Sequence, residues 1–314
     1  MRIGIIGAGM AGLACAEGLG GQGHEVILLD KGRGPGGRMS TRRTATSEGE
    51  AQFDHGAQFF TVRDEGFTRR VDAWMAEGVA APWPAAGPEA YVGVPGMNAP
   101  IRQMAAGQSV HWSTQVSRIE VIEPGYRLHL AEASPLEIEA LILATPAEQA
   151  AALLEALAPD LAARAAATIA EPCWTTMLAF SQPLGVTQDC WRSEGPIGWA
   201  ARNSSKPGRT GPEAWVVQAS PAWSRTWLEA EADEVTAQLS RALADLLEIA
   251  LPDPLSATSH RWRYARSGAE GSGALYDPAR RMGLCGDWLI GPRVEAAWMS
   301  GTALAGHIRS STPA

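Results

Sequence analysis

Three glycines and one aspartate near the start of the chain have the spacing of a dinucleotide-binding turn. The glycines are Gly7, Gly9 and Gly12, and Asp30 follows 18 residues after the last of them. In such a turn the first glycine permits a tight bend, the second lets the backbone approach a pyrophosphate, and the third lets a helix pack against a sheet. The carboxylate accepts hydrogen bonds from ribose hydroxyls and repels the 2′-phosphate of NADP. The chemistry indicated is nucleotide binding, and it fits FAD and NAD alike.

The segments around these glycines are those that such a turn requires. Residues 2–6 form a short apolar run, residues 10–20 form a helix rich in small residues, and residues 24–29 form a second strand that is apolar over its last four positions. Strand, turn, helix and strand make a βαβ unit, which predicts parallel strands and a right-handed crossover. The helix N-terminus, with Met10 and Ala11 in its first turn, would face the negative phosphates.

A second glycine-rich loop follows Asp30 and distinguishes the two cofactors. Residues 30–41 have the sequence DKGRGPGGRMST. This stretch resembles the motif of an acid followed by Gly-Gly-Arg in flavin amine oxidases and their relatives. The resemblance implies that the glycine pair runs along FAD and that the arginine supports its pyrophosphate side. The loop positions assigned to FAD on this ground are Lys31, Gly36, Gly37, Arg38 and Met39.

The other end of the chain carries a matching signal. Residues 283–288 form an apolar strand that ends in Gly-Asp, and a helix is predicted from about Val294 to Arg309. This arrangement resembles the second FAD motif of the same superfamily, and the positive end of the helix would stabilise charge on a reduced flavin. Small residues recur every four positions along the helix, which favours close packing. The assigned positions are Gly286, Asp287, Val294, Glu295, Ala296 and Ala297.

Shorter segments agree with these two motifs. Residues 53–60, FDHGAQFF, resemble the segment that passes beside the flavin ring in this superfamily. Two further positions fall where the superfamily contacts the adenine or passes near the dinucleotide. The positions concerned are His55, Gly56, Ala57, Gln58, Val116 and Thr145.

The resemblance narrows to renalase and the bacterial renalase-like proteins. It rests on FDHGAQFFTVRD at 53–64, WAARNSSKPGR at 199–209, HRWRYA at 260–265 and the segment 285–301. It implies non-covalent FAD and oxidation of the 2- and 6-dihydro isomers of NAD(P)H. A hydride would pass to flavin N5, NAD(P)⁺ would be released, and O₂ would be reduced to H₂O₂.

No catalytic side chain is assigned, because hydride transfer from a dihydropyridine needs positioning rather than a general base. The pocket candidates are aromatic residues that could shape it and arginines that could reach a substrate phosphate. They are His55, Trp262, Tyr264, Trp288, Arg202 and Arg263.

Two other functions fit the same motifs. A flavin amine oxidase would share the fold, and many such enzymes use a lysine near flavin N5. The chain has two lysines; Lys31 belongs to the nucleotide loop, and Lys206 lies in a Ser-Ser-Lys-Pro-Gly stretch that reads as a surface turn. A non-catalytic FAD-binding redox module is the third reading, with the tryptophan-rich segment 172–227 as a partner surface.

These motifs predict an α/β protein with a Rossmann-like, glutathione reductase-type FAD domain. That domain is expected to be discontinuous, built from residues 1–60, 97–152 and 275–314. Residues 61–96 and 153–274 would form a substrate lobe with a mixed or antiparallel sheet. The tryptophans of this lobe would line a flat cavity over the flavin.

The composition of the chain argues against several other classes of protein. The chain has 314 residues, 46% of them hydrophobic, and a formal net charge of −8. A diffuse acidic balance argues against nucleic-acid or membrane surfaces, which need clustered basic residues. The four cysteines form no C-x-x-C pair, and no targeting segment or apolar span of about 18 residues is evident. A cytoplasmic protein with free thiols and no metal is expected, and its oligomeric state stays open.

Overall fold

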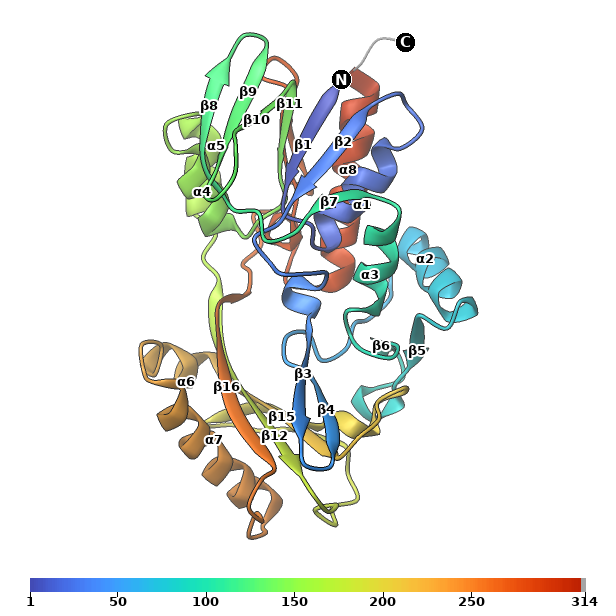
Figure 1. Cartoon of the computed structure of the whole chain (residues 1–314), viewed down its shortest axis with the longest axis vertical. Helices are drawn as coiled ribbons and strands as arrows, with labels where there is room; N and C mark the ends of the chain where they lie inside the picture. The colour runs from blue at the N-terminus through green and yellow to red at the C-terminus, as the bar shows by residue number, and fades with distance from the viewer. Residues whose placement is uncertain (312–314) are drawn as a thin grey trace.

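The computed structural model describes residues 1–311 and has two lobes joined at a narrower waist (Figure 1). The upper lobe contains a six-stranded sheet, and the lower lobe contains a five-stranded sheet. The predicted α/β fold, with a Rossmann-like domain and a second sheet-containing lobe, is confirmed. Residues 312–314, the end of the predicted 275–314 segment, lie outside the described residues.

The sheet of the upper lobe has the strand order β17-β18-β11-β1-β2-β7. Its strands are β1 (Arg2–Ile6), β2 (Glu25–Leu29), β7 (Ser109–His111), β11 (Ala140–Leu143), β17 (Leu275–Asp277) and β18 (Met282–Leu284). Neighbouring strands are parallel except at the edge, where β17 runs antiparallel to β18. Strands from both ends of the chain therefore meet in one sheet, as the two motifs predicted.

Both faces of this sheet are covered, which explains why its central strands are apolar on both faces over residues 3–6, 26–29 and 140–143. Ile5 points to the side of α1 (Met10–Leu19) and α8 (Val294–Ser311). Its neighbour Ile6 points to the opposite side, where a small antiparallel sheet and two helices pack. Successive side chains of β1 thus point into two different hydrophobic cores, one on each side of the sheet.

Helices α1 and α8 pack at very short range. A Cβ at Gly301 would lie 2.0 Å from the carbonyl oxygen of Ala11, and one at Gly18 would lie 2.6 Å from the Cβ of Ala305. Only glycine fits at such contacts, so the predicted small-residue face of the closing helix is confirmed.

The opposite side of the sheet is covered by a three-stranded antiparallel sheet and a helix pair. The elements are β8 (Val116–Ile122), β9 (Gly125–Leu130), β10 (Leu136–Ile138), α4 (Ala147–Leu154) and α5 (Pro159–Ala166). The helical segment after β11 is interrupted between α4 and α5, and α5 begins at Pro159. Proline is favoured in a first helical turn, where its missing N–H costs nothing.

The segment between β2 and β7 holds two antiparallel strand pairs and two α-helices. They are β3 (Thr41–Thr46), β4 (Gly49–Asp54), α2 (Glu65–Ala76), β5 (Ala80–Pro82), β6 (Tyr91–Gly93) and α3 (Ala99–Ala106). The glycine-rich loop that follows Asp30 ends at Ser40, and Thr41 begins β3. The polar run TRRTAT lacks an apolar alternation, so hairpin pairing with β4 decides its structure.

The lower lobe is an antiparallel sheet with helices on one face (Figure 1). Its elements are β12 (Glu171–Phe180), β13 (Cys190–Arg192), β14 (Ile197–Arg202), β15 (Glu213–Ala219), β16 (Ser256–Arg266), α6 (Pro221–Thr226) and α7 (Ala232–Leu247). Trp174 and Trp215 are buried in the core between this sheet and α7. The prediction that the tryptophans line a cavity over the flavin was therefore wrong for these two, because burial of apolar area under α7 uses them.

Residues 61–96 pack beside the upper lobe as well as the lower one. Phe67 and Trp74 of α2 share a core with α1, and that core also contains Trp199 of the lower lobe. Within residues 1–311, no helix is long and apolar enough to cross a membrane. No group of three or more His, Cys, Asp or Glu in the same residues could hold a metal ion.

Candidate functional site

The glycine turn after β1 leaves open space at only one of its three glycines. A Cβ at Gly7 would lie 2.6 Å from the oxygen of Ala144, and one at Gly12 would lie 2.0 Å from the oxygen of Gly7. A Cβ at Gly9 would meet nothing within 4 Å. The protein's own packing thus requires the first and third glycines, whereas the second opens outward. This open space fits the phosphates of a dinucleotide.

The N-terminus of α1 starts at this open space. Gly9 is its N-cap and offers no side chain to the amides of Met10 and Ala11. Asp30 lies at the end of β2, and its carboxylate accepts hydrogen bonds from the amides of Ala8 at 2.8 Å and Gly32 at 2.7 Å. Uncapped helix amides favour an anion here, beside a carboxylate that is already fixed in position.

An ion pair joins the two cofactor motifs at the waist. The guanidinium of Arg38 donates to both carboxylate oxygens of Asp287, at 2.9 and 2.5 Å, and the hydroxyl of Ser267 donates at 2.9 Å. Asp287 is nearly buried and Arg38 about one-third exposed. A bidentate pair of this kind fixes both planes. Residues 249 positions apart are therefore held together, as the resemblance of both segments to FAD motifs implied.

The segment after β4 is held by hydrogen bonds from three directions. The amide of Ala57 donates to the oxygen of Arg38 at 2.8 Å. Gln218 of β15 donates to the oxygen of Gly56 at 2.7 Å, and Trp262 of β16 donates to that of His55 at 2.7 Å. The side chain of Gln58 donates to the oxygens of Asp54 and Gly56. The segment predicted to pass beside the flavin ring is thus rigidly positioned by both lobes.

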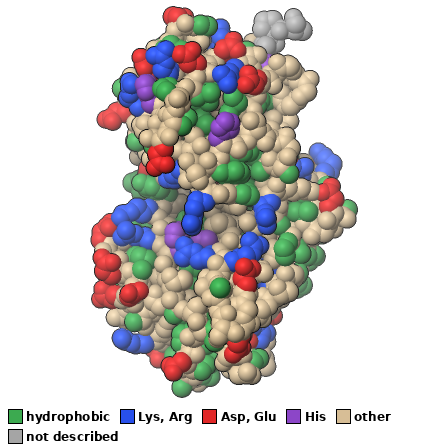
Figure 2. Space-filling view, viewed as in Figure 1, with side chains coloured by type: hydrophobic (Ala, Val, Ile, Leu, Met, Phe, Trp, Pro, Cys, Tyr) green, Lys and Arg blue, Asp and Glu red, His purple; other side chains and the backbone are tan. Residues whose placement is uncertain are grey.

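Three aromatic rings form a cluster next to this segment. The ring centroids of His55 and His260 are 5.1 Å apart, those of His260 and Trp262 are 4.6 Å apart, and those of His55 and Trp262 are 5.1 Å apart. Figure 2 shows histidine side chains at the waist between the lobes, with Lys and Arg side chains gathered around them. The cluster presents flat surfaces where the sequence predicts the substrate pocket.

Both imidazoles of the cluster are kept neutral. Burial, His260 and the charge of Arg42 lower the pKa of His55 from 6.5 to about 4. Burial and Arg42 likewise lower the pKa of His260. At neutral pH the cluster therefore holds no histidine charge.

Because of its lowered pKa, His55 makes the free energy of unfolding depend on pH. The unfolded chain takes up this proton near pH 6.5 and the folded chain near pH 4, so stability is lost as the pH falls from 6.5 towards 4. The contribution of this group is ~3 kcal/mol. Replacing His55 with Gln should flatten that part of the stability curve, measured by urea denaturation at pH 7 and pH 4. The same change at the exposed His307 should leave it unchanged; equal curves for both variants would refute the assignment.

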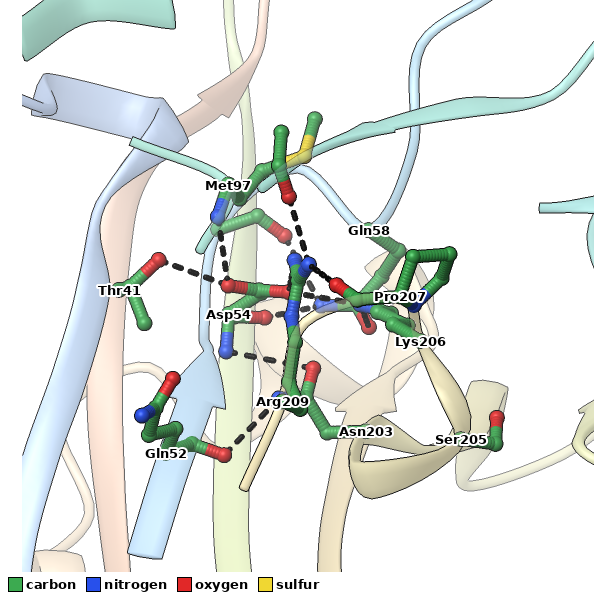
Figure 3. A network of polar contacts seen from close by, with 12 residues as sticks. Thr41, Gln52, Asp54, Gln58, Met97, Asn203, Ser205, Lys206, Pro207 and Arg209 are labelled. Carbon is green, nitrogen blue, oxygen red and sulfur yellow. Dashed lines mark hydrogen bonds and ion pairs between the residues drawn. The ribbon is translucent and has the colours of Figure 1, made fainter. Parts of the chain in front are cut away.

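A buried ionic network lies beneath the segment after β4 (Figure 3). Asp54 is fully buried, and one of its oxygens contacts Lys206 at 3.2 Å and Arg209 at 2.5 Å. The other oxygen accepts from the hydroxyl of Thr41 at 2.7 Å and the amide of Met97 at 2.9 Å. Burial alone would raise the pKa of Asp54, but the two cations outweigh it and lower the pKa to about 2. One carboxylate thus serves two cations.

The position of Lys206 differs most from the sequence prediction. The expected surface turn was wrong, because the Lys206 side chain is fully buried between Asp54 and Gln58, its ammonium 3.2 Å from each. Its ammonium lies 5.2 Å from the ring centre of Trp83. Burial lowers the pKa of Lys206 to about 8, against the opposing effect of Asp54.

The other predicted site residues lie in several places. Arg202 pairs with Asp189, and Arg263 pairs with Glu229 on the exposed side of β16, so neither joins the aromatic cluster. Trp288 is buried and donates to the oxygen of Thr145 at 3.2 Å.

Three further predicted positions have defined surroundings. Val116 is buried in the core beneath the small antiparallel sheet. Glu295 is buried at the start of α8, where its carboxylate accepts from the amides of Arg63 and Asp64. Tyr264 lies on β16 and is half-buried. The remaining residues named for the cofactor lie in the loop after β2 (Lys31, Gly36, Gly37 and Met39), just after β18 (Gly286) and in the first turn of α8 (Val294, Ala296 and Ala297).

Sequence reasoning missed the residues that link the lobes. Asp54, Arg209, Gln218, His260 and Arg42 all border the candidate site in the structure. The alternation in HRWRYA places His260 and Trp262 on one face of β16, and this signal could have identified His260. The other residues meet only through long-range contacts.

Two family models match the chain. The first, an NAD(P)-binding Rossmann-like domain, covers residues 5–73. The second, flavin containing amine oxidoreductase, covers residues 75–309. The second match spans well over half of the chain.

Solved structures agree in fold over the full length. A protein from Exiguobacterium sp. described as a protoporphyrinogen oxidase is 12% identical, with a TM-score of 0.75 and 99% of each chain covered. Cyclohexylamine oxidase from Brevibacterium oxydans is 15% identical, with a TM-score of 0.69 and 98% of each chain covered. A redesigned putrescine oxidase is 13% identical, with a TM-score of 0.66 and 99% of each chain covered. With its own motifs and the model match over residues 75–309, this chain belongs to the flavin-containing amine oxidoreductase family.

Proposed function

We propose that the protein uses FAD to oxidise the 2- and 6-dihydro isomers of NAD(P)H to NAD(P)⁺, with O₂ as acceptor. The observation that carries this proposal is an excess of positive charge beside flat neutral rings. Lys206 and Arg209 share the single carboxylate of Asp54, and Arg42 adds its charge next to His55. Such surroundings favour an anionic, planar substrate.

The residues described above would hold FAD at the waist. Gly9 and the N-terminus of α1 would take the phosphates, and Asp30 would take the ribose. Arg38 and Asp287 would fix the middle of the cofactor, and the start of α8 would face the ring, as the family resemblance implies. When bound, FAD accepts a hydride from a dihydropyridine and delivers the electrons to O₂, which with protons from solvent becomes H₂O₂.

The protein's own contribution to this reaction is positioning. The backbone of residues 55–57 forms hydrogen bonds with Gln218, Trp262 and Arg38, which would fix its place relative to a bound ring. The neutral cluster of His55, His260 and Trp262 offers surfaces for stacking a nicotinamide. Holding a strong hydride donor in a reactive orientation supplies a large rate enhancement without a general base.

Amine oxidation is the second candidate, and Lys206 is the observation that favours it. A buried lysine beside the flavin-facing segment is what many amine-oxidising relatives possess, and Lys206 lies 3.2 Å from Gln58. An alkylammonium substrate would approach the charge of Arg42, and the buried network beneath the segment after β4 adds two cations against the one carboxylate of Asp54. Like charges in a partly desolvated site disfavour its entry.

Aerobic turnover with product analysis tests the proposal. The FAD-loaded protein is given 6-dihydroNAD, 2-dihydroNAD, ordinary NADH or a panel of primary amines, while O₂ uptake, H₂O₂ and NAD⁺ are measured. We expect one NAD⁺ and one H₂O₂ for each molecule of dihydro isomer consumed, and no turnover of amines. Turnover of amines alone would reverse the order of the two candidates, and no turnover of any compound would point to a binding module.

A further inference from the structure

Arg42 is a half-buried cation without a carboxylate partner among residues 1–311. It lies on β3, one position before Arg43, which forms an ion pair with Glu50 at 3.3 Å. An arginine that is partly withdrawn from water normally has an anion or several acceptors. The charge of Arg42 is therefore left for something that binds beside it.

The register of the β3–β4 hairpin places Arg42 on the face that continues to His55. Arg42 is paired with Phe53, and the next position along β3 towards the start of the chain, Thr41, is paired with Asp54. Paired residues share a face and alternate along the strand. Arg42 and Phe53 therefore lie on one face of the hairpin, and Thr41 and Asp54 lie on the other.

His55 and Ser40 continue the face that carries Arg42. The hydroxyl of Ser40 lies 3.4 Å from Nε2 of His55. Phe53 of the same face packs against Met177 and Val216, on the side of the lower sheet away from α7. This side of the sheet also presents His260, whose ring contacts His55. Arg42 of β3 thus lies on the same side as two of the rings, His260 of β16 and His55 of the segment after β4.

The charge of Arg42 acts on both imidazoles and leaves this neighbourhood positive. The guanidinium acts on both His55 and His260, which are kept neutral. Neutral imidazoles can donate N–H bonds to an anion without adding a charge of their own. One full positive charge with two such donors, facing the waist, is the chemistry that recognises a phosphate.

We propose that Arg42, His55 and His260 form a phosphate-binding subsite, which holds a phosphate of the nicotinamide nucleotide while its ring lies over the flavin. This inference rests on the proposed function and names the group by which that substrate is recognised. It makes Arg42 a specificity-determining residue that acts on affinity. It also explains why a substrate without a phosphate, such as a simple amine, gains nothing from this part of the site.

Binding of inorganic pyrophosphate to the FAD-loaded protein tests the subsite without turnover. Isothermal titration should show binding to the wild type and at least about 10-fold weaker binding to Arg42→Gln, because a charge-assisted contact is lost. Arg43→Gln is the matched control, since it removes a neighbouring surface charge, and it should bind as the wild type does. Equal binding by all three proteins would overturn the subsite.

Reduction of the flavin by substrates that differ only in phosphate separates this inference from the proposed function. With the 6-dihydro mononucleotide, Arg42→Gln should raise the half-saturating concentration about 10- to 100-fold and leave the limiting rate near that of the wild type. With the corresponding riboside, which lacks phosphate, the two proteins should behave alike. A variant that is equally impaired with both compounds would contradict a phosphate-specific role.

The two tests fail independently. If no dihydro compound reduces the flavin but pyrophosphate binding depends on Arg42, the proposed function is wrong and the anion subsite stands. If the dihydro isomers reduce the flavin and Arg42→Gln behaves as the wild type in both tests, the function stands and the subsite is wrong.

Discussion

Replacing Gly9 with valine is expected to abolish FAD binding while leaving the fold intact. The backbone at Gly9 is extended, with φ −82° and ψ −170°, and a Cβ there would meet no atom within 4 Å. The protein itself therefore tolerates a side chain at this position. A valine would instead fill the space that the pyrophosphate requires. Loss of two charge-assisted contacts predicts an affinity at least about 100-fold weaker.

Flavin content and stability must be measured together for this variant. FAD titration into flavin-free protein, followed by the change in flavin fluorescence, gives the affinity, and urea denaturation of the flavin-free protein gives the stability. Gly107→Val is the control, because Gly107 is exposed at the end of α3 and its Cβ also meets nothing within 4 Å. Normal FAD affinity in Gly9→Val would mean that the dinucleotide does not use this turn.

Replacing Asp54 with asparagine is expected to destabilise the protein by ~3–5 kcal/mol, or about 5–8 °C in melting temperature. All four groups around this carboxylate donate hydrogen bonds to it, including Lys206 and Arg209. An amide NH₂ would face donors on whichever side it points. The two buried cations would lose the charge that compensates them, which is the costly half of breaking a buried ion pair.

Two further variants serve as a control and as a test of charge compensation for this prediction. Asp72→Asn removes an exposed carboxylate on α2 and should change stability by no more than ~0.5 kcal/mol. Adding Lys206→Met to Asp54→Asn should recover part of the loss, because one unpaired charge disappears. If Asp54→Asn melted at the wild-type temperature, the Asp54 carboxylate would not be what compensates the buried charges of Lys206 and Arg209.

Most of the fold could be predicted from short sequence motifs at the two ends of the chain. The spacing of Gly7, Gly9, Gly12 and Asp30 depends on one short turn, so sequence alone specifies it. The small residues of α8 likewise predicted close helix packing, which Gly301 shows. Both features depend on residues that are close together in the chain, so their spacing can be recognised in a single sequence.

The buried network escaped sequence reasoning for a physical reason. Lys206 lies in a Ser-Ser-Lys-Pro-Gly stretch whose composition is that of an exposed turn, and only contact with Asp54, 152 positions away, buries it. The tryptophans were misplaced for a similar reason. Periodicity does not distinguish a ring that faces α7, as Trp215 does, from one that faces a cofactor.

The central claim, a hydride-accepting flavin site for reduced nicotinamide dinucleotide isomers, is tested most directly by anaerobic stopped-flow absorbance. The FAD-loaded protein is mixed with 6-dihydroNAD, ordinary NADH or a primary amine, and the band of oxidised flavin is followed. Rapid, saturable bleaching by the dihydro isomer, with ordinary NADH and amines leaving the band unchanged, is the result this account predicts. Bleaching by amines while the dihydro isomer leaves the band unchanged would contradict it.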